Sequence, residues 1–283
     1  MLALTIKQAL RMAQHALYGQ ESAQIDSELI VAFAIGRDRT YLYTWPEQTL
    51  SPSQLTLFEA LLERRVLGEP VAYLTGVRDF WSLTLHVNQH VLIPRPETEL
   101  LVETALSLLS EGPQRIADLG TGSGAIALAI AHERPDCHLL ACDLSADALA
   151  LASDNAIRLG INNVTFSQGS WFDALAAEGL AMIVSNPPYI AEGDPHLRQG
   201  DLRFEPVTAL SAKDCGMADI VEIIRGAPAH LAEDGCLLLE HGFDQAAAVR
   251  ALLSEAGFAQ VRTLQDINGC DRVSLGCLTI RSH

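Results

Sequence analysis

Apolar residues in the first 70 positions recur at the spacing of an α-helix. After Ser51 they return every three or four positions until Gly68, which places them on one face of a helix; these residues are Leu55, Phe58, Leu61, Leu62 and Val66. Thr5 with Gln8, and Ser51 with Gln54, have the composition of capping boxes, and Pro52 suits a first helical position. We expect a small helical bundle at residues 1–75.

The pattern changes to strand-like alternation between residues 77 and 93. Leu83, Leu85 and Val87 alternate with polar neighbours. Asn88 and Gln89 are a predicted turn before a second strand at 90–93. We expect a β-hairpin within residues 76–95 that joins two domains.

From residue 96 onward, short apolar runs alternate with helical stretches, among them 146–159 and 217–231. Strands are expected at 115–119, 138–142, 164–166, 181–185 and 236–240, with two more near residues 260 and 274. Such alternation is typical of a mostly parallel sheet with helices on both faces. Residues 96–283 are therefore predicted to form one α/β domain around a seven-stranded sheet.

The composition is that of a globular chain. Of 283 residues, 49% are hydrophobic and 19% charged, which are ordinary values for a folded domain. The longest aliphatic stretch, 125–131, is far shorter than the ~20 residues of a membrane span. The amphipathic N-terminus contains Lys7 and Arg11 and no cleavage signal follows it, which favours a core helix over a signal peptide. We expect no membrane partner and a cytoplasmic location.

Cysteine and histidine spacing favours neither metal binding nor hydrolysis. The six cysteines form no C-x-x-C pair and lie mostly in apolar runs, which predicts reduced core thiols rather than disulfides or zinc ligands; they are Cys137, Cys142, Cys215, Cys236, Cys270 and Cys277. The nine histidines lack H-E-x-x-H spacing, and no G-x-S-x-G motif occurs. We expect no metal site.

The net charge of −16 is unevenly distributed along the chain. Residues 1–90 carry a net charge of −2, and the remainder carries −14. Because affinity for nucleic acid rests on basic contacts to phosphate, this charge disfavours a DNA or RNA partner. A local basic patch would still be compatible with one.

A glycine-rich turn follows the first predicted strand of the α/β domain. The stretch DLGTGSGAIAL contains Gly120, Thr121, Gly122, Ser123 and Gly124 between a strand and a helix. Glycine permits tight turns and close approach of a ligand, and the helix that follows offers free N–H groups. Such a turn serves NAD, S-adenosylmethionine or simply the close packing of helix on strand.

Asp143 comes directly after the second strand, 19 residues beyond Gly124. A carboxylate at this place accepts both hydroxyls of a ribose that lies over the glycine turn. The alternative is a turn or helix N-cap aspartate before Leu144 and Ser145. The glycines follow G-x-G-x-G rather than the G-x-G-x-x-G of dinucleotide folds, which favours S-adenosylmethionine over NAD.

The sequence SNPPY, at 185–189, ends the fourth strand. Neither Pro187 nor Pro188 has an N–H for a strand ladder, so the strand must stop and the carbonyls of the turn stay free to accept hydrogen bonds. The turn lies on the same edge of the sheet as the glycine turn, where α/β sheets bind ligands. A rigid surface turn would explain the prolines but not the flanking Asn186 and Tyr189.

These motifs resemble those of amino-methyltransferases that use S-adenosylmethionine. More closely, the chain resembles the release factor glutamine methyltransferases; the matching stretches are LTGVRDFWSLTLHV, LIPRPETE at 92–99, DLRFEPVTAL at 201–210 and LLLEHG at 237–242. The resemblance implies a Rossmann-like methyltransferase sheet of seven strands, a small helical bundle that recognises the substrate, and a connecting hairpin. It also implies action, as a monomer, on the glutamine of the Gly-Gly-Gln motif in class I peptide chain release factors.

That reaction gives the NPPY turn a chemical role. If the Asn186 side-chain oxygen and the Pro187 carbonyl each accept one amide N–H, the nitrogen is fixed toward the methyl group and its developing charge is stabilised. Pro188 completes the substrate wall, and Tyr189 is expected to stack on the planar amide. Trp171 is expected to cover the adenine, as the family's aromatic does, or to be a core tryptophan.

The segment IPRPETE contains Arg95, Glu97 and Glu99. It has the composition of a helix start, with Pro96 at the first position, and the family resemblance implies a place near the substrate channel. Three other functions stay open: an exocyclic-amine methyltransferase of DNA or RNA, a glutamine methyltransferase of a ribosomal protein, and a noncatalytic S-adenosylmethionine-binding scaffold. The scaffold is disfavoured because it would not need Asn186.

Overall fold

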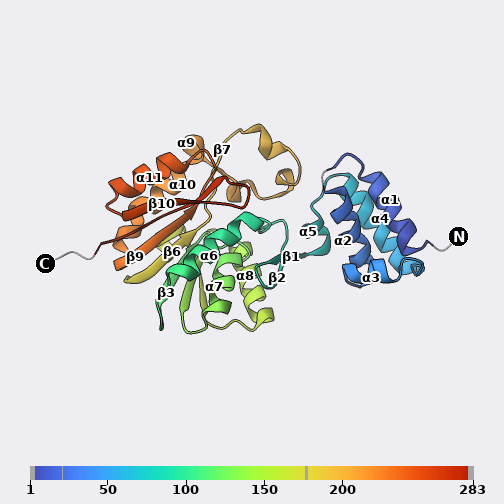
Figure 1. Ribbon diagram of the computed structural model, residues 1–283, viewed down its shortest axis with the longest axis horizontal. Helices are drawn as coiled ribbons and strands as arrows, with labels where there is room; N and C mark the ends of the chain where they lie inside the picture. The colour runs from blue at the N-terminus through green and yellow to red at the C-terminus, as the bar shows by residue number, and fades with distance from the viewer. Residues whose placement is uncertain (1–3, 21, 176–177, 280–283) are drawn as a thin grey trace. The chain divides into compact units, whose positions relative to one another are not determined.

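The computed structural model describes residues 4–20, 22–175 and 178–279. The chain divides into two compact units, Met1–Val77 and Arg78–His283. Figure 1 shows the helices of the first unit in colours from blue to teal and the sheet of the second from green to red.

The first unit contains five helices among its described residues: α1 Ile6–Ala16, α2 Ala23–Ile35, α3 Arg39–Thr44, α4 Pro52–Val66 and α5 Val71–Thr75. Both predicted capping boxes are present: the Thr5 and Ser51 hydroxyls accept the backbone N–H groups of Gln8 and Gln54, and the backbone N–H groups of Thr5 and Ser51 donate to the Gln8 and Gln54 side-chain oxygens. The helices enclose a separate apolar core. The predicted bundle is therefore confirmed.

A hairpin of β1 Val77–Phe80 and β2 Leu83–His86 follows. The predicted turn at Asn88 is present, since the Val91 N–H donates to the Asn88 carbonyl at 3.2 Å, but it does not close the hairpin. The hairpin turns at Trp81, which has a φ of 57°. Trp81 is held there by its backbone N–H, which donates to Glu99 (2.8 Å), and by its indole N–H, which donates to Glu133 (2.7 Å). The predicted second strand at 90–93 is an irregular segment.

The second unit contains the predicted seven-stranded sheet, in the order β10-β11-β9-β6-β3-β4-β5. The strands are β3 Arg115–Leu119, β4 His138–Asp143, β5 Val164–Gln168, β6 Leu180–Ser185, β9 Leu231–Glu240, β10 Ala259–Gln265 and β11 Asp271–Cys277. The five from β9 to β5 in this order are parallel, and β11 is antiparallel to both of its neighbours. The helices are α6 Glu99–Leu108, α7 Ala125–Glu133, α8 Ala146–Leu159, α9 Lys213–Gly216, α10 Ala218–Gly226 and α11 Ala246–Glu255, and β7 Ile190–Ala191 pairs with β8 Ser211–Ala212 in a separate small sheet.

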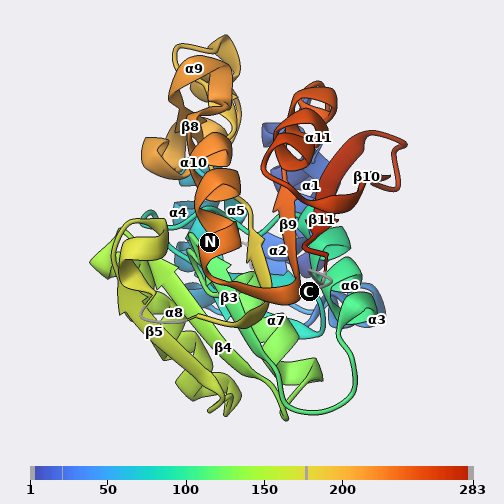
Figure 2. The same ribbon diagram turned by 90° about the vertical axis from the view of Figure 1, so that its left-hand side faces the viewer.

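Both faces of the sheet are buried, as alternate side chains show. Met182 and Val184 of β6 join an apolar cluster with residues of α6, α7 and α8, whereas Ile183 between them joins a second cluster with residues of α10 and α11. Figure 2 shows these layers from the side. The predicted helix 217–231 was too long, because α10 ends at Gly226 and a short turn containing Pro228 leads into β9.

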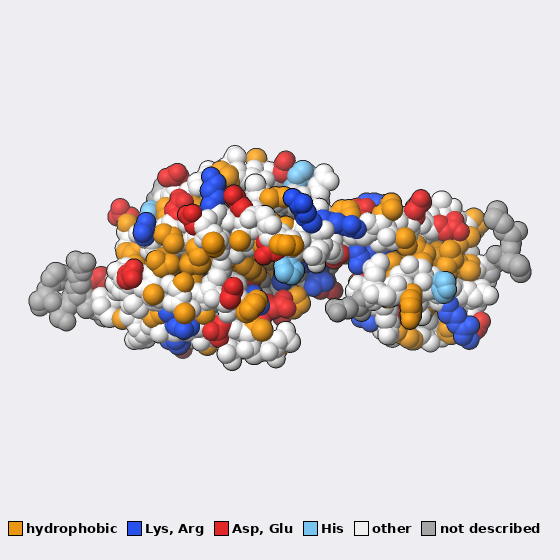
Figure 3. Space-filling model, turned by 90° about the horizontal axis from the view of Figure 1, so that it is seen from above, with side chains coloured by type: hydrophobic (Ala, Val, Ile, Leu, Met, Phe, Trp, Pro, Cys, Tyr) orange, Lys and Arg blue, Asp and Glu red, His pale blue; other side chains and the backbone are white. Residues whose placement is uncertain are grey.

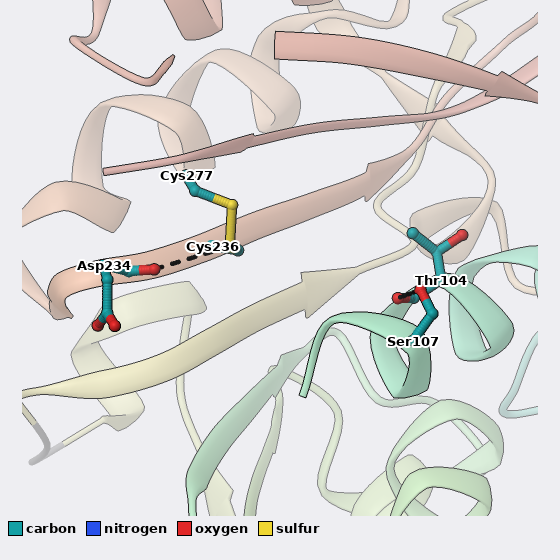
Figure 4. The surroundings of a disulfide bond; sticks show 5 residues. All are labelled: Thr104, Ser107, Asp234, Cys236 and Cys277. Atoms are coloured by element: carbon teal, nitrogen blue, oxygen red, sulfur yellow. Dashed lines mark hydrogen bonds between the residues drawn. A yellow bond between two sulfur atoms is a disulfide. The ribbon is translucent and has the colours of Figure 1, made fainter. Parts of the chain in front are cut away.

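The expectation that all cysteines are reduced was wrong for one pair. Cys236 of β9 and Cys277 of β11 are joined by a disulfide, shown in Figure 4. They are direct partners in the antiparallel register of these strands, a juxtaposition that brings two Cβ atoms within bridging range. The two cysteines are 41 residues apart in the sequence, so local spacing gave no sign that they pair. The other four cysteines are free, with Cys137 and Cys142 buried.

Within the described ranges, no helix is both long and apolar enough to cross a bilayer. Among the same residues, no cluster of three or more His, Cys, Asp or Glu side chains could hold a metal ion. On the face drawn in Figure 3, acidic and basic side chains of the second unit are interspersed.

Candidate active site

A pocket of about 660 Å³ opens at the carboxyl edge of the parallel strands. The chain leaves this edge after β3, β4, β5 and β6, and a ligand site at such an edge is the rule in open α/β sheets. The predicted residues that line the pocket are Gly120, Thr121, Gly122, Ser123, Asp143, Trp171, Asn186 and Pro188. Gly124, Pro187 and Tyr189 lie beside it without lining it.

The glycine turn is fixed by the end of the neighbouring strand. The N–H groups of Gly120 and Thr121 both donate to the Cys142 carbonyl at 2.9 Å. Gly122 has a φ of 56°, and a Cβ built on it would meet no atom within 4 Å. At Gly124 a Cβ would lie 2.9 Å from a side-chain carbon of Leu128. Gly122 is thus open to a ligand, whereas Gly124 serves helix packing.

Asp143 binds the same turn from the adjacent strand. Its Oδ2 atom accepts the N–H of Gly122 at 2.8 Å, and its Oδ1 atom accepts the N–H of Ser145 at 2.9 Å. The N-cap of α8 is Ser145, whose hydroxyl accepts the N–H of Ala148. Asp143 is therefore not the N-cap, and its half-buried carboxylate faces the pocket.

Asp118, the fourth residue of β3, is a buried acid beneath this turn. Its Oδ2 atom accepts from the hydroxyl of Thr121 (2.7 Å) and the N–H of Ala127 (3.2 Å), while Oδ1 has no partner among the described residues. Burial raises the pKa of Asp118 to about 7, against the two hydrogen bonds that lower it. Sequence reasoning missed this residue, although its place at the strand end before a glycine turn is a usable signal.

Trp171 lies between the pocket and the apolar core. It begins a short 3-10 helix, Trp171–Ala174, with a φ of 41°, and it is half-buried. Its ring lies over Gly120, because a Cβ built there would be 3.2 Å from Trp171 Cζ3. Trp171 lines the pocket and also packs against the apolar cluster under α10 and α11.

The NPPY turn begins where β6 ends. The Ser185 hydroxyl donates to the Leu119 carbonyl at 2.6 Å, which locks the end of β6 to the end of β3. The Asn186 side-chain nitrogen donates to the hydroxyl oxygen of Thr98 at 3.2 Å. With its nitrogen engaged in this way, Asn186 offers its side-chain oxygen as the group for a ligand in the pocket.

Tyr189 has a different environment from the one expected for stacking on a substrate. Its hydroxyl donates to Glu240 Oε1 at 3.3 Å, and its carbonyl accepts from Gln245 Nε2 at 3.0 Å. The ring packs against the apolar cluster under α10 and α11, and burial raises its pKa. In this geometry Tyr189 supports the turn from behind, because its polar end is drawn to the buried Glu240.

Two matching stretches far apart in the sequence meet at the rim of the pocket. Glu205, of DLRFEP, is 4% exposed, accepts the N–H of Ile93 at 3.0 Å and forms an ion pair with Arg95 of IPRPETE. Arg95 lines the pocket. Glu99 instead binds the hairpin turn. Sequence reasoning did not single out Thr98, Glu205 or Glu240, whose contacts cross long separations.

The glycine turn, the acid after the second strand and the Asn-Pro-Pro-Tyr turn share one edge of a sheet whose last strand, β11, inserts antiparallel between β10 and β9. This combination defines an α/β methyltransferase. Two family profiles agree: the "PrmC N-terminal domain" matches residues 8–76 and the "Methyltransferase small domain" matches residues 96–200.

Full-length relatives define the family. The chain is 53% identical over 267 residues to the release factor glutamine methyltransferase of Escherichia coli (strain K12), covering 94% of this chain and 96% of the relative. It is 48% identical over 278 residues to that of Vibrio cholerae, covering 97% of each. The chain belongs to the release factor glutamine methyltransferase family, and it is an S-adenosylmethionine-dependent enzyme of the protein glutamine methyltransferase class.

The fold also matches solved structures of low sequence identity. A methyltransferase from Pyrococcus furiosus superimposes with a TM-score of 0.53 at 18% identity, covering 69% of this chain and 89% of the other. This match supports the α/β methyltransferase fold.

Proposed function

We propose that this enzyme transfers the methyl group of S-adenosylmethionine to the side-chain amide nitrogen of the glutamine in the Gly-Gly-Gln motif of class I peptide chain release factors. The observation that carries the proposal is the Asn186 side chain, which lines the pocket with its nitrogen bound to Thr98 and its oxygen left to accept. An acceptor at this place suits a primary amide, which has two N–H groups to donate.

The residues around the pocket fit S-adenosylmethionine. Gly122 leaves backbone space, Asp143 presents a carboxylate that suits ribose hydroxyls, and the Trp171 ring forms an apolar wall. Asp118 has a buried oxygen without a partner in the part of the chain that the structure describes, close under the turn. When bound, the cofactor supplies a sulfonium methyl group as electrophile.

The chain's own residues then orient the nucleophile. An amide nitrogen is a poor nucleophile because its lone pair is delocalised, so its position relative to the methyl group limits the rate. The Asn186 oxygen accepts one N–H and the Pro187 carbonyl accepts the other, and both acceptors stabilise the positive charge that develops on nitrogen. Pro188 forms the adjoining wall of the pocket.

The charge of the second unit supports a protein substrate over nucleic acid. The segment after residue 90 carries a net charge of −14, which repels a phosphate backbone. The same chemistry would serve a glutamine in a ribosomal protein, and the assay includes that substrate. We further propose that the enzyme acts as a monomer in the cytoplasm, where release factors work.

The test is methyl transfer from labelled S-adenosylmethionine to purified class I release factor, to ribosomal proteins and to DNA or RNA. Label should enter the release factor and should be absent from a release factor whose Gly-Gly-Gln glutamine is changed to alanine. Label in nucleic acid, or in ribosomal protein in preference to release factor, would refute the proposed substrate.

We also propose that the first unit selects the protein partner. A chain that begins at Val77 keeps the hairpin, which Asn155 of α8 holds by hydrogen bonds to the N–H (2.8 Å) and carbonyl (3.0 Å) of His86. This shortened chain should bind S-adenosylmethionine like the full chain, yet methylate release factor poorly because the partner contacts are missing. Equal rates at low release factor concentration would contradict this role.

A further inference from the structure

A buried carboxyl lies behind the NPPY turn, outside the pocket. Glu240 ends β9 and is 1% exposed. Its Oε1 atom accepts the Tyr189 hydroxyl, and its Oε2 atom has no hydrogen-bond partner within the described residues. A buried carboxylate oxygen without a partner is costly. Its position therefore needs an explanation beyond packing.

Thr98 connects this carboxyl to the pocket. It is 4% exposed, ends the short helix η1 Pro96–Thr98, and lines the pocket. Its oxygen accepts from Asn186 Nδ2. No hydrogen bond joins Thr98 to Glu240 among the described residues, but the Thr98 hydroxyl is near enough to that carboxyl to lower the pKa of Glu240. A hydroxyl has one hydrogen and two lone pairs, so Thr98 can accept from Asn186 while it donates to Glu240.

We propose that Glu240 and Thr98 are positioning residues that hold the Asn186 side chain with its oxygen turned toward the substrate amide. This inference rests on the proposed function, in which that oxygen accepts a substrate N–H. The two ends of an asparagine amide have nearly the same shape, so packing alone does not select one. An ionised Glu240 accepts only, which directs the Thr98 hydrogen toward Glu240 and leaves a Thr98 lone pair for Asn186 Nδ2.

An inverted Asn186 amide would place two donors opposite the N–H donors of the substrate. A protonated Glu240 favours that inversion, because its O–H donates to Thr98 and the Thr98 hydrogen is then free to bind the Asn186 oxygen. The ionised form of Glu240 is therefore the productive one.

Several charged or titratable groups face Glu240 and set its protonation. Burial raises the pKa of Glu240 to about 7, Thr98, Arg272 and Tyr189 lower it, and Glu97 raises it. Arg272, on β11, is in turn paired with Asp266 at 3.3 Å. The neighbouring residue, His241, is turned to Ser274 at 2.7 Å.

The experiment compares Glu240→Gln, Thr98→Val and Thr98→Ser with Glu103→Gln, a control that removes an exposed carboxylate from α6. Glutamine at 240 has one oxygen for two hydroxyl donors, and valine at 98 has no acceptor for Asn186. Both variants should lose ~10- to 100-fold in kcat on release factor, with S-adenosylmethionine affinity within about twofold of wild type. Thr98→Ser should recover most of the rate lost in Thr98→Val.

The pH profile adds a readout that a purely structural role would not change. Wild-type kcat should rise with pH through about 7, as Glu240 ionises, and this rise should be absent in Glu240→Gln. A wild-type rate and profile in Glu240→Gln, with release factor still labelled by the wild-type enzyme, would overturn the inference while leaving the proposed function intact.

A spectroscopic arm decides the inference even if release factor is not the substrate. In ¹⁵N spectra of the full-length protein, the side-chain NH₂ signals of Asn186 are those lost in Asn186→Ala. They should shift in Glu240→Gln and in Thr98→Val and stay in place in Glu103→Gln. Unshifted Asn186 signals in Glu240→Gln would show that Glu240 does not act through Thr98 on Asn186. If Glu240→Gln does not fold, a pH titration of the wild-type Asn186 signals gives the same decision, because they should move as Glu240 ionises near pH 7 and would stay in place if Glu240 has no influence on Asn186.

Discussion

Gly216 packs directly against the backbone of the NPPY turn at Tyr189. We expect a substitution at this glycine to lower the rate of methyl transfer, although Gly216 does not line the pocket. Gly216 has a φ of 82°, and a Cβ built on it would lie 2.1 Å from the Tyr189 carbonyl oxygen and 2.7 Å from its carbon. Ordinary contact between such atoms needs more than 3 Å, so Gly216→Ala must displace one of the two segments by about 1 Å. A misplacement of about 1 Å costs on the order of 10²-fold in rate.

The matched control is Gly193→Ala. Gly193 also has a φ of 82°, but a Cβ on it would meet no atom within 4 Å. Both variants should lose about 1 to 2 kcal/mol of stability from the left-handed backbone. The Tyr189 carbonyl clash is confined to Gly216→Ala.

The assay measures kcat on release factor, S-adenosylmethionine affinity by calorimetry and unfolding by denaturant. Gly216→Ala should lose about 100-fold in kcat and retain cofactor affinity, whereas Gly193→Ala should keep the wild-type rate. Equal rates for the two variants would show that the position of the Tyr189 backbone does not limit methyl transfer.

Three further variants test the site. Asp143→Ala should weaken S-adenosylmethionine binding by ~1 to 3 kcal/mol, since a charged acceptor for ribose is lost and Gly122 loses its anchor; an unchanged calorimetric dissociation constant would retire the ribose assignment. Asn186→Ala should lower kcat by ~100-fold with little change in cofactor affinity, and a wild-type rate would reduce the NPPY turn to a structural element. Glu240→Gln concerns stability: because burial raises the folded pKa of Glu240 from 4.5 to about 7, its contribution is present below pH 4.5 and is lost as pH rises through 7. The free energy of unfolding of the variant, relative to that of wild type, should therefore rise by up to about 3 kcal/mol between pH 4 and pH 8 in denaturant unfolding. A difference between the two proteins that does not change with pH would contradict the raised pKa.

Local patterns predicted the elements well where each element is set by its own residues. The strand at 115–119 and the helix at 146–159 have the predicted bounds, because a short apolar run and a helical stretch are each determined by neighbouring residues. The hairpin turn was misplaced because Trp81 is fixed by Glu99 and Glu133, 18 and 52 residues away. The disulfide was missed for the same reason, since strand register decides it.

The same distinction applies to the pocket. The sequence alone predicted that three residues lie close together, namely Gly122, Asp143 and Asn186. Parallel strands end at one edge of a sheet, and each of these residues comes at the end of a strand. The places of Thr98 and Glu240 could not be predicted, because their links to Asn186 and Tyr189 span 88 and 51 residues. Nothing in the local sequence marks a threonine or a glutamate as a support for a turn elsewhere.

The order of the parallel strands has a consequence for how such enzymes diversify. The glycine turn and Asp143, which we propose bind the methyl donor, lie at the ends of β3 and β4, whereas Asn186 and Glu240 lie at the ends of β6 and β9, on the other side of β3. The residues that would change to accept a new nucleophile therefore lie at the ends of β6 and β9, in a different part of the chain from the donor-binding residues at the ends of β3 and β4. Substitutions near Asn186 can therefore change which substrate is accepted while the residues that bind the methyl donor stay the same.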